Sequence, residues 1–400
     1  MINLEKLQKI SKSTSSKIVM LIFDGLGGLP HPDTGKTALE TARTPYLDKL
    51  AEDSICGLSH PIGPGITPGS GPAHLALFGY NPMKYTIGRG ILEALGINYD
   101  LKKTDVACRA NFCTVDANGL VTDRRAGRIA TEESSKLCEN LSKIKVNGVK
   151  LSVVPVAEHR FVLVFHGGGL SSDLSDTDPQ YEGLKPLKAK ALSKEADSMA
   201  VLVNDFIEKA KGILANCHPA NMLILRGFSQ IPVIPHFTDI YKLKAAAIAS
   251  YPMYLGLAKC VGMKAISCNS VKEEFNALTR VYNDYDFFFV HVKKTDTHGE
   301  DGNFKAKVEE IEKADSFVPK LTKLGPNVIV VTGDHSTPAL LKGHSWHPTP
   351  LLIYSQYCRK DNVRLFRETD CASGALGNLP AVNIMPLAMA NALKLNKYGA

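Results

Sequence analysis

Three segments of the chain are almost continuous apolar runs, which cover residues 17–25, 286–292 and 327–333. Runs of this length without polar alternation are typical of strands that are buried on both faces, as in parallel sheets. Between the second and third runs, apolar residues recur near helical spacing from Phe304 to Leu321. Strand, helix and strand in this order indicate a βαβ unit, so we predict an α/β core.

The middle of the chain has a different pattern. From about residue 105 to 230 the apolar segments are shorter and mixed, and turn sequences separate them. Residues 160–165 predict a strand and residues 194–214 predict a helix. An α+β domain inserted into the α/β core is the simplest arrangement. We therefore expect a core built from residues 1–103 and 232–400, and an inserted domain of residues 104–231.

The composition is that of a folded protein. The chain has 400 residues, of which 44% are hydrophobic and 22% are charged, and its mean hydropathy is −0.06. No apolar run approaches the roughly 18 residues that a membrane span needs, so we expect no membrane segment. The first apolar run is too short for a secretory signal, and the nine cysteines form no C-x-x-C motif. Both features predict a cytoplasmic protein with reduced thiols.

The net charge bears on the kind of partner. The 47 basic and 40 acidic side chains give a formal charge of +7, and the basic residues are spread along the chain. A nucleic-acid-binding protein usually concentrates them in one patch with aromatic residues. The sequence therefore predicts no nucleic-acid partner. The positive charge suits a small anionic substrate, although a merely soluble surface explains it equally well.

Each of the three predicted strands is followed by an aspartate, namely Asp24, Asp296 and Asp334. Ligands of α/β sheets bind beyond the carboxyl ends of the strands, and three carboxylates there repel one another unless cations lie between them. Two histidines, His335 and His344, follow the third aspartate. Carboxylate and imidazole together favour Mn, Zn or Mg over a soft metal. Any single aspartate is alternatively a turn or helix-capping residue.

A loop rich in glycine and proline, residues 67–72, leads into a predicted helix start. The free N–H groups of a helix N-terminus make a natural phosphate site. Ser70 in this loop is a candidate nucleophile, activated by a metal ion rather than by a general base. The alternative is structural, because serine is a favoured N-cap and Pro72 suits the first helical turn.

Three motifs, residues 22–27, 67–82 and 332–338, carry a resemblance to a known family. Over nearly its whole length the chain resembles the cofactor-independent phosphoglycerate mutases of the archaeal type, within the alkaline phosphatase superfamily. The resemblance implies an alkaline-phosphatase-like core, with a mostly parallel sheet flanked by helices, and an inserted α+β cap domain. It also implies an isomerase that interconverts 3- and 2-phosphoglycerate through a phosphoserine. Such an enzyme serves glycolysis and gluconeogenesis and needs no 2,3-bisphosphoglycerate.

The resemblance further implies two divalent metal ions, with Mn or Mg favoured ahead of Zn. The residues that it assigns to one ion are Asp24, Ser70, Asp334 and His335. The residues that it assigns to the other ion are Asp296 and His344. The family has a histidine four residues after the aspartate of the second site, whereas this chain has Glu300 there. A glutamate ligand favours a harder ion such as Mg or Mn, and His298 and Asp301 are the alternatives to it.

The implied reaction needs a closed site, because glycerate must not escape and water must not reach the phosphoserine. The inserted domain suits the role of a lid, and its arginines suit bidentate binding of phosphate and carboxylate. The candidates for substrate binding are Arg125, Arg128, His159, Arg160 and Arg226, with Asp176 for a glycerate hydroxyl. Each of them is alternatively a surface charge.

Two other functions are compatible with the same residues. A metal-dependent phosphatase or another phosphomutase of the superfamily would share the metal core and differ in the inserted domain. A non-catalytic phosphometabolite-binding protein is the second alternative, and Glu300 is the feature that invites it. The expected partner is a small phosphoglycerate. The sequence leaves the oligomeric state open, a homo-oligomer included.

Overall fold

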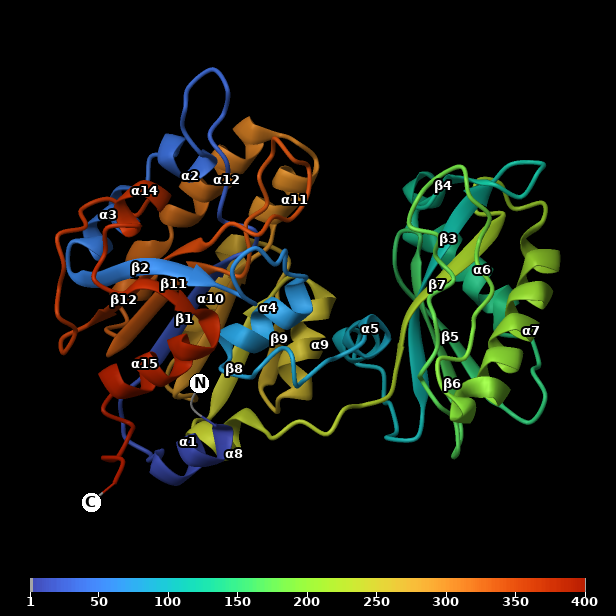
Figure 1. Cartoon of the computed structure of the whole chain (residues 1–400), viewed down its shortest axis with the longest axis horizontal. Helices are drawn as coiled ribbons and strands as arrows, with labels where there is room; N and C mark the ends of the chain where they lie inside the picture. Colours follow the sequence, from blue (N-terminus) through green and yellow to red (C-terminus); the bar gives the residue numbers. More distant parts are fainter. Residues whose placement is uncertain (1–2, 400) are drawn as a thin grey trace. The chain divides into compact units, whose positions relative to one another are not determined.

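The computed structural model describes residues 3–399, which fold into two compact units (Figure 1). The core unit comprises the chain up to Thr86 and again from Ile234, and the inserted unit comprises Ile87–Val233. The sequence placed these divisions at 103/104 and 231/232. The first division lies earlier because α5 (Arg89–Gly96) packs on strands of the inserted unit. Gly90 permits this close packing, since an added Cβ there would lie 2.3 Å from the carbonyl oxygen of Ala107.

The core unit is built on an eight-stranded sheet with the order β13-β2-β12-β11-β1-β10-β8-β9. Its strands are β1 (Ile18–Phe23), β2 (Ser54–His60), β8 (Ala245–Ala249), β9 (Lys264–Ser267), β10 (Phe287–Val292), β11 (Val328–Gly333), β12 (Thr349–Ser355) and β13 (Gly377–Pro380). Strand β12 runs antiparallel to both of its neighbours, and the other pairings are parallel. The sheet is thus mostly parallel, which confirms the predicted α/β fold class.

The three predicted strands form the fully buried centre of this sheet as β1, β10 and β11. The βαβ prediction correctly gives the parallel direction of β10 and β11 and the presence of helices between them. However, β10 and β11 are not neighbours, because β1 lies between them and pairs with both. The carboxyl ends of three adjacent parallel strands therefore meet at one point of the sheet edge.

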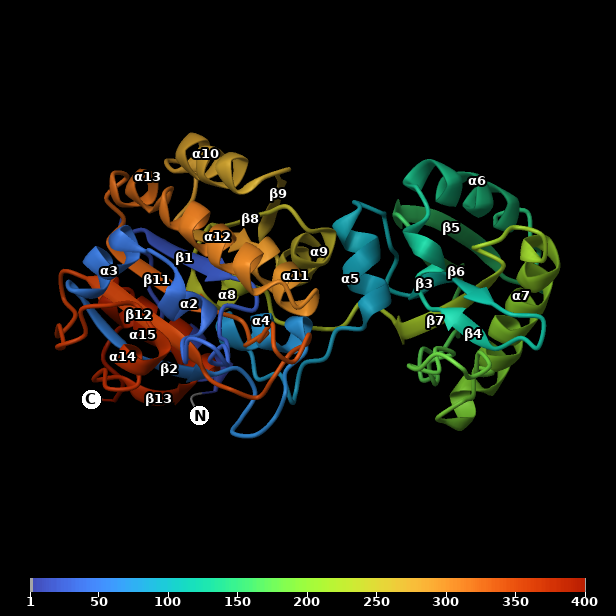
Figure 2. The ribbon, with the colours of Figure 1, turned by 90° about the horizontal axis from the view of Figure 1, so that it is seen from above.

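Helices pack on both faces of the core sheet (Figure 2). Alternate residues of β1, Val19, Leu21 and Phe23, share one apolar cluster with helices α2, α3, α10, α12 and α13. On the other face, the rings of His74 in α4 and Phe237 in α8 contact Phe289 and Phe287 of β10. The helices of this unit are α1 (Leu4–Ile10), α2 (Ala38–Thr41), α3 (Pro45–Ala51), α4 (Ser70–Leu77), α8 (Phe237–Tyr241), α9 (Pro252–Cys260), α10 (Val271–Val281), α11 (Lys294–Glu300), α12 (Phe304–Asp315), α13 (Val318–Thr322), α14 (Glu368–Cys371) and α15 (Ile384–Asn391).

The inserted unit contains a five-stranded antiparallel sheet with the path β4-β3-β6-β5, in which β7 also pairs with β3. Its strands are β3 (Val106–Val115), β4 (Val121–Asp123), β5 (Lys150–Ala157), β6 (Arg160–His166) and β7 (Met222–Ser229). Helices α6 (Thr131–Leu141) and α7 (Asp197–Leu214) pack on one face, and α5 packs on the other (Figure 2). The predicted strand and helix correspond to β6 and α7.

Within residues 3–399, none of the helices combines the length and the apolar character that crossing a membrane requires.

Candidate metal centre and arginine cluster

The three predicted aspartates meet at the carboxyl ends of β1, β10 and β11. Asp24 follows β1, Asp334 and His335 follow β11, and Asp296 lies in the first turn of α11 after β10. The Nε2 atom of His335 lies 3.1 Å from Asp334 Oδ2 and 3.4 Å from Asp24 Oδ1. Ligand atoms of these three residues all lie within 4.8 Å of one another. These residues meet because the three strands are buried and parallel, so the polar residues that follow them lie at the same edge of the sheet.

A second group lies beside the first and shares His335. Ligand atoms of Asp296, His335 and His344 lie within 4.8 Å of one another, and Asp296 Oδ1 is 3.6 Å from His344 Nε2. The two imidazole rings stack with their centroids 3.6 Å apart. The structure therefore brings together the aspartates and histidines that the family resemblance assigns to two metal ions.

The chemistry of the cluster fits divalent cations. All three carboxylates are buried, and within residues 3–399 Asp24 Oδ1 and Asp334 Oδ2 accept no hydrogen bond, although imidazole nitrogens lie close to both. Burial, and next the charge of Asp24, raise the pKa of Asp334 well above its usual value. Buried oxygens without partners and mutually repelling carboxylates are unfavourable unless cations bind between them. Oxygen and imidazole donors suit Mn, Mg or Zn.

Lys293 supplies part of the positive charge that this cluster needs. Its Nζ lies 2.9 Å from Asp24 Oδ2 and 2.6 Å from Asp296 Oδ2. Burial opposes the charged form of Lys293, but the two carboxylates outweigh it and raise its pKa. The lysine thus bridges the two carboxylates that the family resemblance assigns to different ions.

Ser70 is the first residue of α4, and the capping alternative for it is wrong. The N-cap is Gly69, and the helix start has no side-chain cap hydrogen bond. The half-buried Ser70 instead places its Oγ 3.3 Å from His335 Nε2. A hydroxyl therefore lies next to the carboxylate and imidazole cluster, at a helix N-terminus whose amides favour an anion.

Glu300 lies one helical turn after Asp296 on α11. Its side chain is 49% exposed, and its Oε1 is 3.9 Å from His344 Nε2. The glutamate is thus at the margin of the second group rather than within it. His298 is half-buried and Asp301 is exposed on the same short segment. That Glu300 completes the second metal site, with His298 and Asp301 as the alternatives, stays a prediction.

Two buried residues that sequence reasoning missed hold the candidate ligands in place. His74, one turn after Ser70, has its Nδ1 2.8 Å from the Ser70 carbonyl oxygen and 3.3 Å from Asp334 Oδ2. Burial lowers the pKa of His74 to about 4, so the ring is neutral at pH 7. The Tyr254 hydroxyl donates a 2.5 Å hydrogen bond to Asp24 Oδ2. The only sequence signal was the spacing of His74 from Ser70, since Tyr254 lies 230 residues from its partner.

Lys307 is a third residue that the sequence did not single out. Its ammonium group is buried and donates to the carbonyl oxygens of Gly25 at 2.7 Å, Gly27 at 3.1 Å and Thr337 at 2.8 Å. It therefore ties together the loops that follow β1 and β11 and carry Asp24, Asp334 and His335. The sequence offered one signal for Lys307, namely that this charged residue lies on the apolar face of the helix predicted between Phe304 and Leu321.

The inserted unit contains a separate cluster of basic groups. His159 is buried in the turn between β5 and β6, next to Glu158, whose φ of 50° is rare for a non-glycine residue. Burial, and then the charges of nearby arginines, lower the pKa of His159 to about 3. These arginines are Arg160, Arg109, Arg125 and Arg128. All of these residues except Arg109 were named from the sequence as candidates for substrate binding.

Two of the arginines contact a buried carboxylate on α5. Glu93 Oε1 lies 3.5 Å from Arg109 NH1 and 4.0 Å from Arg160 NH1. Arg109 also faces Arg226 in the β3–β7 pairing. Glu93 was not predicted, although it partly neutralises this face of the sheet.

The remaining predicted residues are placed by local contacts. Arg226 NH1 is 3.3 Å from Asp178 Oδ2, and Asp176 Oδ1 accepts a 2.7 Å hydrogen bond from the Gly227 amide. Arg125 and Arg128 are exposed in a turn in which three consecutive residues, 126–128, have positive φ. Backbone strain of this kind often marks ligand-binding loops.

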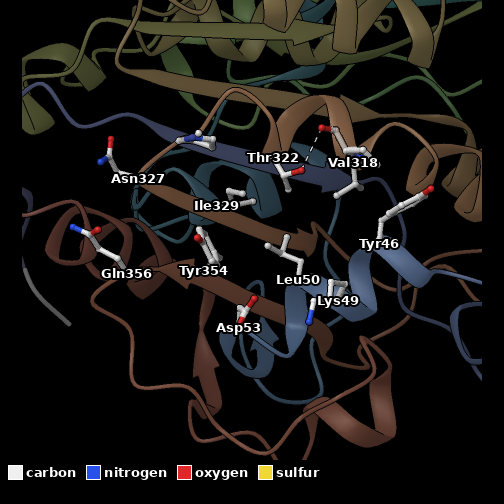
Figure 3. Close-up of a pocket in the computed structure, with 13 residues that line it drawn as sticks. Tyr46, Lys49, Leu50, Asp53, Val318, Thr322, Asn327, Ile329, Tyr354 and Gln356 are labelled. Atoms are coloured by element: carbon white, nitrogen blue, oxygen red, sulfur yellow. Dashed lines mark hydrogen bonds between the residues drawn. The ribbon is translucent and has the colours of Figure 1, made fainter.

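A cavity of about 490 Å³ lies at the opposite edge of the core sheet (Figure 3). It is lined by Asn327 just before β11, by Tyr354 near the end of the antiparallel β12, and by Tyr46 and Asp53. The metal-ligand cluster follows the other end of β11, so this cavity contains none of the predicted site residues. Its charged side chains already have partners, as in the Asp53–Lys360 pair.

Comparisons with known proteins show the family to which the chain belongs. The family model described as 2,3-bisphosphoglycerate-independent phosphoglycerate mutase matches residues 51–221. Proteins named as probable 2,3-bisphosphoglycerate-independent phosphoglycerate mutases are 50% identical over 398 residues in Thermosipho africanus and 51% identical over 399 residues in Thermotoga maritima. The first alignment covers 98% of this chain and 98% of its relative, and the second covers 99% of each.

Solved structures give the same result. A Pyrococcus horikoshii protein has a TM-score of 0.83 and 31% identity, with 98% of this chain and all of that chain covered. The cofactor-independent phosphoglycerate mutase of Thermoplasma acidophilum has a TM-score of 0.69 and 32% identity, with 94% of this chain and all of that chain covered. The chain therefore belongs to the family of 2,3-bisphosphoglycerate-independent phosphoglycerate mutases, which are isomerases.

Proposed function

We propose that this chain interconverts 3-phosphoglycerate and 2-phosphoglycerate through a phosphoserine on Ser70, at a site for two divalent ions, as a cytoplasmic enzyme of glycolysis and gluconeogenesis. The observation that carries the proposal is the position of the Ser70 hydroxyl, 3.3 Å from His335 Nε2 at the N-terminus of α4. A half-buried serine that does not cap its helix is available as a nucleophile.

The proposed metal ligands fall into two sets. One set is Asp24, Ser70, Asp334 and His335, and the other is Asp296, Glu300 and His344. When bound, Mn or Mg ions there would lower the pKa of the serine hydroxyl and offset the charge of the phosphoryl oxygens. The donor atoms suit these ions better than a soft metal.

The serine carries the phosphoryl group between two substrate oxygens. In the first transfer the Ser70 hydroxyl gives up its proton and its Oγ bonds to phosphorus, the bond between phosphorus and the C3 oxygen breaks, and that oxygen takes up a proton, which leaves glycerate within the site. In the second transfer the C2 oxygen of glycerate attacks the phosphoserine, and the serine hydroxyl is restored. The amides at the start of α4 would hold the phosphoryl oxygens throughout.

The basic cluster of the inserted unit is the proposed site for the anionic groups of the substrate. Arg125, Arg128, Arg160 and Arg226 offer guanidinium groups for bidentate binding of phosphate or carboxylate. His159, neutral because of its lowered pKa, offers a hydrogen bond without further charge. Asp176 already accepts from a backbone amide, and its second oxygen is proposed to accept from a glycerate hydroxyl.

An enolase-coupled assay with 3-phosphoglycerate and Mn, without 2,3-bisphosphoglycerate, tests this function when free phosphate is measured in parallel. We expect 2-phosphoglycerate without phosphate release, and loss of activity with a chelator or with Ser70→Ala. Ser142→Ala, at the exposed end of α6, is the matched control and should remain active. Free phosphate as the main product would instead identify a phosphatase. The absence of both products would favour the non-catalytic alternative.

A further inference from the structure

The inserted unit contains an Asp-His-Ser arrangement that the mutase reaction does not use. Asp105 Oδ2 lies 3.0 Å from His166 Nδ1, and His166 Nε2 lies 2.9 Å from Ser152 Oγ. The Asp105 side chain is 1% exposed, the His166 side chain is 20% exposed, and Ser152 is half-buried. The carboxylate is thus enclosed, whereas His166 and Ser152 keep part of their surface exposed. This sequence of contacts is that of a nucleophile, a base and a group that orients the base.

Strand register explains why these residues meet. Strand β5 pairs only with β6 among the described strands, so Ser152, which pairs with Val164, lies on the edge strand of the sheet. The neighbours of Ser152 in β5 pack toward α6 and α7, which leaves its side chain on the opposite face. On β6 the same alternation turns His166 to that face, and Asp105 directly precedes β3, the other neighbour of β6. The triad is therefore held by three strands.

The arrangement lies at the opposite end of β6 from Arg160 and His159. Arg160 and His166 are the first and last residues of β6. At a rise of about 3.3 Å per residue, their Cα atoms are about 20 Å apart. The triad is consequently not a part of the proposed phosphoglycerate-binding groups.

The hydrogen bonds define the proton positions. The Lys102 amide donates to Asp105 Oδ2 at 3.0 Å and holds the carboxylate in place. A carboxylate at Nδ1 makes that nitrogen the donor, so Nε2 is the acceptor and faces the Ser152 hydroxyl. The Tyr99 hydroxyl donates to Ser152 Oγ at 2.7 Å and lies 3.2 Å from His166 Nε2. A hydroxyl donor next to the nucleophile is suited to stabilise an oxyanion.

We propose that Ser152, His166 and Asp105 form a second, metal-independent nucleophilic site that cleaves small activated carboxylic esters. The Ser152 oxygen bonds to the carbonyl carbon of the ester while its proton moves to His166 Nε2. The bond from this carbon to the leaving oxygen then breaks, and His166 returns the proton to that oxygen. Water, deprotonated by His166, attacks the acyl-serine and releases the carboxylic acid, which restores the hydroxyl. Tyr99 donates to the oxyanion in both halves.

The first test is labelling of the full-length protein with a fluorophosphonate probe in the presence of a chelator, followed by peptide mass spectrometry. We expect the label on Ser152. Hydrolysis of p-nitrophenyl acetate is measured alongside it, and Ser152→Ala or His166→Gln should lower the rate about 100-fold, the scale of a positioned base. Asp105→Asn should lower the same rate, because it removes the group that orients His166.

Two controls separate this site from the metal centre and from misfolding. Ser70→Ala must retain the label and the hydrolysis, because Ser70 is the other candidate nucleophile of the chain. If Ser152→Ala shows an altered thermal melting curve, Ser152→Cys replaces it, and we then expect rapid alkylation of that thiol by iodoacetamide that His166→Gln abolishes. An unlabelled Ser152 in the wild type, or equal hydrolysis by wild type and His166→Gln, would overturn the proposal and reduce the triad to a structural hydrogen-bond network.

Discussion

Replacing Lys307 by methionine should flatten the pH dependence of stability in the alkaline range. The buried ammonium group donates to three backbone carbonyl oxygens, and burial lowers its pKa from 10.5 to about 8. Between these pH values the unfolded chain binds more protons at this position than the folded chain does. The free energy of unfolding of the wild type therefore rises with pH in this window.

The magnitude follows from the size of the shift. A lowering of about 2.5 pKa units corresponds to about 3.4 kcal/mol over the whole window. Between pH 7.5 and pH 10 the wild type should gain about 2.4 kcal/mol from this one group. Lys307→Met has no proton to release and should lack this gain. Other groups titrate alike in both proteins, so they cancel in the difference.

Urea unfolding at a series of pH values, followed by circular dichroism, measures this difference. Lys305→Met on the same helix is the matched control, because the Lys305 side chain is 88% exposed. We expect the control to follow the wild type and Lys307→Met to diverge from it as the pH rises. Parallel curves for all three proteins would refute the reasoning, since they would mean that folding does not perturb the Lys307 ammonium group.

Three further substitutions test the proposed site. Tyr254→Phe removes the hydroxyl that donates to Asp24 and should weaken Mn binding about 10-fold by calorimetry, with little change in fold. Glu300→His should shift the ratio of Zn to Mg affinity toward Zn by about 10-fold, because imidazole replaces a hard oxygen donor. Arg160→Met should raise the KM for 3-phosphoglycerate about 10-fold or more, through loss of a charge-assisted hydrogen bond.

Two of these variants, Tyr254→Phe and Arg160→Met, have a matched control. Tyr46→Phe and Arg359→Met change exposed residues of the core unit and should leave metal affinity and KM unchanged. Equal affinities for Tyr254→Phe and wild type would contradict the positioning role of that hydroxyl. An unchanged Zn preference in Glu300→His would place Glu300 outside the metal site.

The residues of the candidate metal centre were predictable because the local sequence pattern determines their position. A buried parallel strand is visible as an apolar run, and whatever follows it lies at the carboxyl edge. This reasoning found Asp24, Asp296 and Asp334. The order of the strands was not predictable, because the insertion of β1 between β10 and β11 depends on pairing between distant segments. For the same reason the partners of Lys307 and Tyr254 could not be named.

The boundary of the inserted unit and the Asp105–His166–Ser152 arrangement were likewise not predictable, because both depend on contacts between distant segments. An amphipathic helix such as α5 has the same pattern whether it packs on its own unit or on the neighbouring one. Its partner became clear only from the close approach at Gly90. Asp105, Ser152 and His166 form no sequence motif, since strand register alone brings them together.

The most direct test of the central claim is a trapping experiment on Ser70. The protein is mixed with 3-phosphoglycerate carrying a labelled phosphate and is quenched in acid during turnover, and the labelled peptide is identified by mass spectrometry. The account predicts the label on Ser70, its transfer to 2-phosphoglycerate when the reaction continues, and no label in free phosphate. An unlabelled Ser70 during active turnover, or label that appears mainly as free phosphate, would contradict it.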